Sequence, residues 1–167
     1  MRRVRVSGAV LVALVAAVVV VVVVVVVLVA TSGPSSPGDV TFRASTGEAV
    51  AGPTAWCDVA VTECENDADA VVSLGVPPGT DLAVTVPGEV AATPWQVAFS
   101  FRDATGTVLD GRSPVFAPHA RTQFTLALPD PTGRLVSAEV QQYGARLAVT
   151  PEGPGFSTRS TWVLQQR

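Results

Sequence analysis

A continuous apolar stretch at residues 8–30 is the feature that most restricts how this chain can fold. It contains ten consecutive valines, Val18 to Val27. As a helix its 23 residues would span roughly 34 Å, which matches the hydrocarbon core of a bilayer. Because lipid offers the backbone no hydrogen-bond partners, a single run of this kind must be helical there. We therefore expect residues 8–30 to form a transmembrane signal anchor.

The charges on either side of this run predict its orientation. Arg2, Arg3 and Arg5 precede it, whereas the first arginine after it is Arg43. The positive-inside rule then places residues 1–7 in the cytoplasm and the rest of the chain outside the cell membrane. The alternative is secretion after cleavage near Ser32, where small residues surround the peptide bond. The run is longer than an ordinary signal-peptide core, which favours the anchor.

Small residues repeat within the run. Ala9, Ala13 and Ala17 recur every four residues and would share one helix face, which allows two membrane helices to approach closely. A homodimer through this face is therefore one expectation. Residues 31–38 have the Ser, Gly and Pro composition of a linker, and eight residues reach at most about 28 Å.

Residues 39–167 are predicted to form one extracytoplasmic all-β domain. Apolar and polar residues alternate with a period of two in several short runs, which indicates strands with one buried face. Turn sequences rich in Pro, Gly and Asp separate these runs. The pattern favours an immunoglobulin-like β-sandwich of about seven or eight strands. The clearest runs lie at 40–43, 82–86, 96–102, 123–128, 136–141, 147–149 and 162–164.

Charge excludes some classes of partner. From residue 31 onward the chain has eight arginines and fourteen acidic residues, a formal net charge of −6. A domain of this sign lacks the basic surface of a nucleic-acid-binding protein. It also has no long-range attraction to anionic lipid headgroups or phosphate-rich wall polymers.

Cys57 and Cys64 are the only cysteines. In an exported domain an even cysteine count predicts a disulfide, here closing the short loop 58–63, which we expect to be a hairpin. The alternative is a redox-active pair, but the spacing is not Cys-x-x-Cys and no βαβ pattern surrounds it.

Several motifs carry a resemblance to a known family. They are WCD at 56–58 with Cys64, VPPG at 76–79, TPWQV at 93–97, RS at 112–113, EVQQYG at 139–144, and STR at 157–159 with Trp162. With these motifs the chain resembles an actinobacterial envelope family known as domain of unknown function 2771, from about residue 38 to the C-terminus. The resemblance implies an N-terminal hydrophobic segment and a small exported domain. It implies no activity and no catalytic residues.

Few residues could support catalysis. His119 is the only histidine and there is no lysine, so a paired-histidine metal site, a Schiff base and a phosphate-binding P-loop are all excluded. A hydrolase would have to use His119, which follows Pro118 in a predicted loop. We expect no cofactor.

Two further groups are candidate ligand or partner sites. Four acidic residues near the second cysteine could offer oxygen ligands to calcium, although their spacing is not that of an EF-hand. Polar and aromatic residues at strand ends are candidate contacts for a partner. The acids are Glu63, Glu65, Asp67 and Asp69, and the candidate contacts are Trp95, Gln141, Gln142 and Tyr143.

These observations leave three functions in order of preference. The first is a membrane-tethered, non-enzymatic interaction or structural module of the cell envelope with a protein partner. The second is a β domain that binds a small apolar or lipid ligand in its interior. The third is a small hydrolase using His119. A large apolar cavity would favour the second, and a cleft joining His119 to a serine and a carboxylate would favour the third.

Overall fold

The computed structural model describes residues 18–21, 36–150 and 153–167 of the 167-residue chain. The chain divides into two units, Met1–Ser35 and Ser36–Arg167. In the first unit the described residues are helical.

The predicted signal anchor at 8–30 lies mostly outside the described residues. So do its candidate dimer contacts Ala9, Ala13 and Ala17, and the alternative cleavage site near Ser32. Among the residues that the structure describes, no helix is long and apolar enough to cross a membrane. The anchor, its orientation and its cleavage stay predictions.

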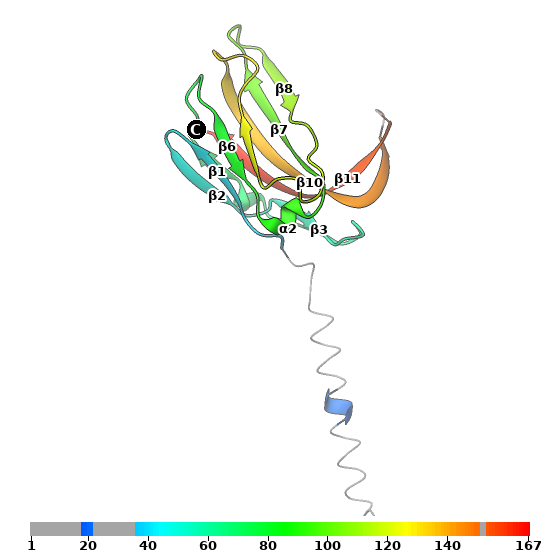
Figure 1. Ribbon diagram of the computed structural model, residues 1–167. Helices are drawn as coiled ribbons and strands as arrows, with labels where there is room; N and C mark the ends of the chain where they lie inside the picture. The colour runs from blue at the N-terminus through cyan, green and yellow to red at the C-terminus, as the bar shows by residue number, and fades with distance from the viewer. Residues whose placement is uncertain (1–17, 22–35, 151–152) are drawn as a thin grey trace, which may run out of the picture. The chain divides into compact units, whose positions relative to one another are not determined.

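Two β-sheets enclose a common core in the second unit (Figure 1). The smaller sheet is antiparallel in the order β2-β1-β6-β9, with β1 at Val40–Ala44, β2 at Gly47–Ala51, β6 at Leu82–Thr85 and β9 at Gln123–Leu126. The larger sheet has the order β4-β3-β11-β10-β7-β8, with β5 pairing in parallel with β11. Its strands are β3 at Ala55–Cys57, β4 at Cys64–Asn66, β5 at Val72–Leu74, β7 at Trp95–Arg102, β8 at Val108–Arg112, β10 at Arg134–Thr150 and β11 at Gly153–Gln166.

The chain passes repeatedly between the two sheets. After the β1–β2 hairpin it enters the larger sheet for β3 to β5, returns for β6, and crosses again for β7–β8, for β9 and for β10–β11. The all-β prediction is therefore confirmed, but the expected seven or eight strands are too few. The described residues contain eleven, because β2 and β8 are mostly exposed and β3, β4 and β5 have three residues each, so none of these five shows a clear alternating pattern. Among the described residues of the second unit, two short helical segments accompany them, η1 at Ala68–Ala70 and α2 at Gly88–Ala91.

Alternation along the strands builds the core. In β7, Val97, Phe99 and Phe101 are buried, whereas the intervening Ala98 and Ser100 are half-buried on the outer face. Two fully buried tryptophans keep their indole N–H groups hydrogen-bonded, as buried tryptophans usually do. Trp95 Nε1 donates to Arg121 O and Trp162 Nε1 donates to Gly38 O, each at 3.2 Å.

Two residues of the predicted linker, Pro37 and Gly38, contact the sandwich. Pro37 is buried and the Gly38 carbonyl accepts the hydrogen bond from Trp162, so these two residues pack on the sandwich, whereas Ser36 is exposed. The proline ring removes apolar surface from water, which explains why the compact unit begins before β1.

The long β10–β11 hairpin extends beyond the rest of the larger sheet, as its orange and red strands show in Figure 1. Its register shifts between Gln142 and Tyr143 and again between Tyr143 and Leu147. Such bulges bend a strand and increase its twist, so they mark the point where the hairpin leaves the sandwich.

Candidate functional site

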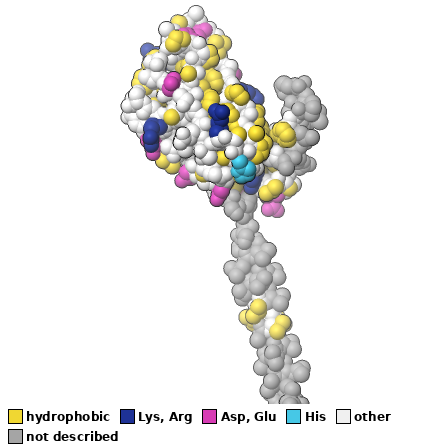
Figure 2. All heavy atoms as spheres, viewed as in Figure 1, with side chains coloured by type: hydrophobic (Ala, Val, Ile, Leu, Met, Phe, Trp, Pro, Cys, Tyr) yellow, Lys and Arg dark blue, Asp and Glu magenta, His cyan; other side chains and the backbone are white. Residues whose placement is uncertain are grey.

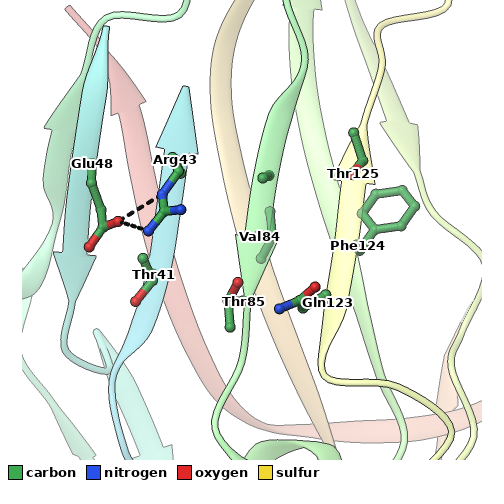
Figure 3. A pocket seen from close by; sticks show the side chains of 9 residues that line it. Thr41, Arg43, Glu48, Val84, Thr85, Gln123, Phe124 and Thr125 are labelled. Carbon is green, nitrogen blue, oxygen red and sulfur yellow. Dashed lines mark hydrogen bonds and ion pairs between the residues drawn. The ribbon is translucent and has the colours of Figure 1, made fainter. Parts of the chain in front are cut away.

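The outer face of the smaller sheet carries a hollow of about 370 Å³ (Figure 3). Phe42 and Val84 point into the core, so their strand neighbours point outward. The pairing register then places Thr41, Thr85 and Gln123 side by side on β1, β6 and β9. These residues form the first of two polar rows across the sheet.

The second row contains Glu48, Arg43, Ala83 and Thr125, again directly opposite one another on successive strands. Arg43 Nε and Nη2 donate to Glu48 Oε2 at 2.8 and 2.5 Å. Ala83 is the small residue between Arg43 and Thr125, which gives the hollow its depth.

The chemistry of this hollow is that of a neutral hydrogen-bonding surface. Its hydroxyl and amide groups can donate and accept, while the Arg43–Glu48 pair carries no net charge. Both members of that ion pair are exposed, so its contribution to stability is small. The arrangement can bind polar groups of a partner, but it contains no histidine, cysteine or carboxylate pair for acid–base or nucleophilic chemistry.

Two of the four predicted partner contacts are buried. Trp95 is fully buried against Phe116, with ring centroids 4.6 Å apart, and Gln142 is 1% exposed. Gln142 Nε2 donates to the carbonyls of Glu89 and Val90 at 3.1 and 3.4 Å, which fastens α2 to β10. The expectation that both residues contact a partner is therefore corrected, because position at a strand end does not reveal what covers it.

Gln141 and Tyr143 lie half-buried on the outer face of the larger sheet. Gln141 Oε1 accepts from Gln96 Nε2 at 2.8 Å, Gln141 Nε2 donates to Glu139 Oε1 at 2.9 Å, and Tyr143 Oη donates to Gln141 Oε1 at 3.4 Å. Burial raises the pKa of the Tyr143 hydroxyl, so it stays protonated at neutral pH. These polar groups already satisfy one another, which leaves them less available to a partner than the hollow.

His119 is exposed at the surface (Figure 2, cyan). Its backbone N–H donates to Ala91 O at 2.7 Å, and its φ of 58° is left-handed. Within the described part of the chain, no serine or carboxylate is hydrogen-bonded to its ring. The structure thus does not bring together the triad that a hydrolase using His119 would need.

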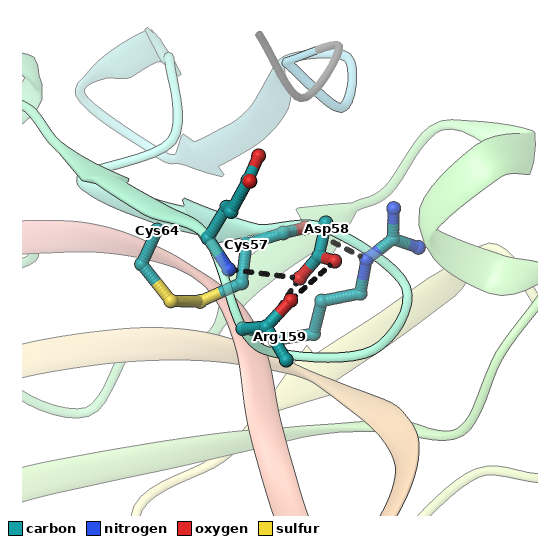
Figure 4. The surroundings of a disulfide bond; sticks show 6 residues. Cys57, Asp58, Cys64 and Arg159 are labelled. Atoms are coloured by element: carbon teal, nitrogen blue, oxygen red, sulfur yellow. Dashed lines mark hydrogen bonds between the residues drawn. A yellow bond between two sulfur atoms is a disulfide. The ribbon is translucent and has the colours of Figure 1, made fainter.

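The predicted disulfide is confirmed, and Figure 4 shows its surroundings. Cys57 and Cys64 face each other across the β3–β4 hairpin, with Cα atoms 4.0 Å apart. Asp58 organises the enclosed loop, since its carboxylate accepts from the backbone N–H and hydroxyl of Thr62 and from the N–H of Glu63. The hydrogen bonds, led by that from the Thr62 backbone, lower the pKa of Asp58.

The four acidic candidates for calcium, Glu63, Glu65, Asp67 and Asp69, are all exposed. Asp67 caps η1 by accepting a hydrogen bond from the Asp69 N–H at 3.0 Å. Across the described residues, no three histidine, cysteine or acidic side chains are grouped so that they could hold a metal ion.

Sequence reasoning missed the residues of the hollow. Thr41, Thr85 and Thr125 each alternate with buried apolar residues, and this signal gives their outward direction. What no local pattern reveals is that β1, β6 and β9 are neighbours, because they are far apart in the sequence.

One comparison with known proteins identifies a relationship. The family model described as "Protein of unknown function (DUF2771)" matches residues 33–166. Neither a curated protein nor a solved structure matches the chain.

Proposed function

Because this chain belongs to the DUF2771 family of proteins of unknown function, we propose a role for it from its own residues. The protein is a non-enzymatic binding module of the bacterial cell envelope. The segment at 8–30 holds it in the cell membrane, and its β domain binds a partner protein outside the cell through the hollow on the smaller sheet. The immunoglobulin-like assignment belongs to the same proposal and is supported by the repeated crossing of the chain between two sheets.

The observation that carries the proposal is the contrast between the core and this hollow. Trp95, Trp162 and Phe42 fill the interior of the sandwich. The hollow, in contrast, is open to solvent and lined by groups that can form hydrogen bonds. A filled interior and an open polar surface suit recognition of another macromolecule better than enclosure of an apolar ligand.

The location rests on the sequence. Arg2, Arg3 and Arg5 before a run of 23 apolar residues support a retained anchor with its N-terminus inside. The disulfide between Cys57 and Cys64 supports an oxidising compartment for the domain.

A photo-reactive residue at Thr85 tests the binding face in intact cells. Thr85 is exposed in the first row of the hollow, so we expect it to crosslink one partner protein. The photo-reactive residue in place of Ala104, in the exposed turn after β7, should not crosslink that protein.

A matched pair of substitutions then tests whether the hollow itself is needed. Ala83→Trp fills it, and Ala98→Trp makes the same change at an outward, half-buried alanine of the larger sheet. We expect the Thr85 crosslink to fall at least tenfold in Ala83→Trp and to persist in Ala98→Trp. Equal yields in the two variants would place the partner elsewhere.

A separate labelling experiment tests the orientation. Ser36 is exposed, and both native cysteines are held in the disulfide, so Ser36→Cys supplies the one reactive thiol. A membrane-impermeant maleimide should label it on intact protoplasts. Labelling that requires lysis would overturn the extracytoplasmic location.

A further inference from the structure

Three arginines line a second pocket of about 310 Å³, which shares no lining residue with the hollow. Arg102 ends β7, Arg134 begins β10, and Arg167 follows β11. The rest of the lining is mainly apolar and includes Pro77, Pro78 and Val136. A volume of this size suits a small molecule.

The three guanidinium groups have few partners. Arg102 and Arg134 are directly opposite each other on neighbouring antiparallel strands, where like charges repel. Arg102 Nη1 donates to Gly106 O at 2.8 Å. In the described part of the chain, the side chains of Arg134 and Arg167 make no hydrogen bond, and the only salt bridge is the Arg43–Glu48 pair, which does not line this pocket.

Carboxylates in the turns beside β7 and β10 do not neutralise the arginines by contact. Asp103 accepts hydrogen bonds from Thr105 and Thr107 within its own turn. Asp130 also accepts hydrogen bonds within its own turn, since one of its oxygens accepts from both the N–H and the hydroxyl of Thr132. The other Asp130 oxygen accepts from the Ala104 N–H, and in the described part of the chain neither carboxylate forms an ion pair with Arg102, Arg134 or Arg167.

The three arginines make this pocket positive, whereas the domain as a whole is negative. From residue 31 onward acids exceed arginines by six, yet three of the eight arginines line this single pocket. A net negative domain gives no long-range attraction to anions, so binding here would depend on short-range contacts with the guanidinium groups.

A β-bulge contributes to the apolar wall. Leu135 and Ser137 pair with the consecutive residues Phe101 and Ser100, which leaves Val136 without a partner on β7. Bulges re-aim side chains, and Val136 is 36% exposed at the pocket. An exposed valine beside two prolines offers an apolar surface next to the cationic groups.

We propose that this pocket binds a small amphiphilic anion, a carboxylate or phosphate monoester on a short apolar group. Arg134 and Arg167 hold the anionic head, with Arg102 adding charge. The apolar part lies against Pro77, Pro78 and Val136. Arginine suits both head groups because its planar fork donates two hydrogen bonds to paired oxygens.

Calorimetric titration of the full-length protein in a non-ionic detergent at low salt tests this proposal. The probes are hexanoate and hexyl phosphate, with acetate, inorganic phosphate and hexanol as matched controls that lack either the apolar part or the charge. We expect at least one hexyl anion to bind at least fivefold more tightly than its short counterpart and than hexanol. The better of the two identifies the head group as a carboxylate or a phosphate.

Variants separate a built site from a general charge effect. Arg134→Gln should lower the affinity for the hexyl anion at least fivefold. Arg112→Gln removes the same charge from an exposed position outside the pocket and should leave that affinity unchanged. Both arginines are exposed, and equal thermal midpoints will verify that both variants fold. Equal weakening in the two variants, no gain from the hexyl group, or no binding of either anion would overturn the proposal.

Discussion

The ring of Phe99 lies directly over Gly111 on the neighbouring strand, and a Cβ atom at position 111 would sit 2.4 Å from Phe99 Cζ. Only glycine leaves room for this contact, because Phe99 is 8% exposed and held in the core. We expect Gly111→Ala to lower the free energy of unfolding by about 1–3 kcal/mol, measured by denaturant titration. Gly88→Ala is the matched control, since a Cβ atom there meets nothing within 4 Å. A Gly111→Ala protein as stable as Gly88→Ala would contradict the packing.

Two buried serines should respond oppositely to the same substitution. Ser160 Oγ is buried and has no hydrogen-bond partner among the described residues, so it is desolvated without compensation. Ser113 Oγ accepts from the Val97 N–H and donates to Pro114 O, both at 2.9 Å. We expect Ser160→Ala to leave the free energy of unfolding unchanged or raise it by about 1 kcal/mol, and Ser113→Ala to lower it by about 1–2 kcal/mol. The reverse order would show that Ser160 has a partner in solution.

Acid should destabilise the domain through three turn aspartates. Hydrogen bonds lower the pKa values of Asp58, Asp103 and Asp130, so the charged forms stabilise the fold above the unfolded aspartate pKa of about 3.9. That stabilisation is lost as the pH falls through the lower folded-state values. The leading donors are the Thr62 backbone N–H for Asp58 and the hydroxyls of Thr105 and Thr132 for Asp103 and Asp130.

The thermal midpoint should therefore be nearly constant between about pH 5 and 7 and fall below about pH 4. The triple variant with asparagine at positions 58, 103 and 130 should show a shallower fall. Asp81→Asn is the control, because within the described residues the Asp81 carboxylate accepts no hydrogen bond. An unchanged acid slope in the triple variant would assign acid sensitivity to other groups.

The disulfide should stabilise the domain through the small loop that it closes. Cysteines seven positions apart restrict the unfolded chain by an amount that corresponds to about 2–3 kcal/mol. We expect Cys57→Ala with Cys64→Ala to lower the free energy of unfolding by that amount, and reductant to bring the wild type to the same value. Mass spectrometry without reduction checks the bond directly, and free thiols in protein purified from the envelope would refute it.

Strands of four or more residues with one buried face could be predicted from the sequence, whereas mostly exposed strands and strands of three residues could not. The alternation of Leu82, Val84 and Val86 with Ala83 and Thr85 correctly predicts β6. By contrast, most of β8 is exposed because it lies at the edge of its sheet, so burial imposes no period of two on its sequence.

The candidate sites likewise divide into those that the sequence predicts and those that depend on contacts between distant segments. The Cys57–Cys64 pairing could be predicted because only one intramolecular pairing exists. The burial of Trp95 and Gln142 could not be predicted, because it depends on contacts with segments far away in the sequence, such as that of Gln142 with α2. The arginine pocket depends on the pairing of Arg102 with Arg134, which are 32 positions apart in the chain.

Substitution of His119 distinguishes a binding module from a hydrolase. Any histidine-based mechanism must use this side chain, and general-base catalysis is worth about 100- to 10,000-fold in rate. His119→Asn suits the test because asparagine also tolerates the left-handed backbone at φ 58°. Since the side chain is exposed, the free energy of unfolding should change by no more than about 0.5 kcal/mol. We expect this variant to complement a deletion strain fully and to give the same Thr85 crosslink. A variant that folds with an unchanged thermal midpoint but behaves like the deletion would establish a role for the imidazole and favour the hydrolase.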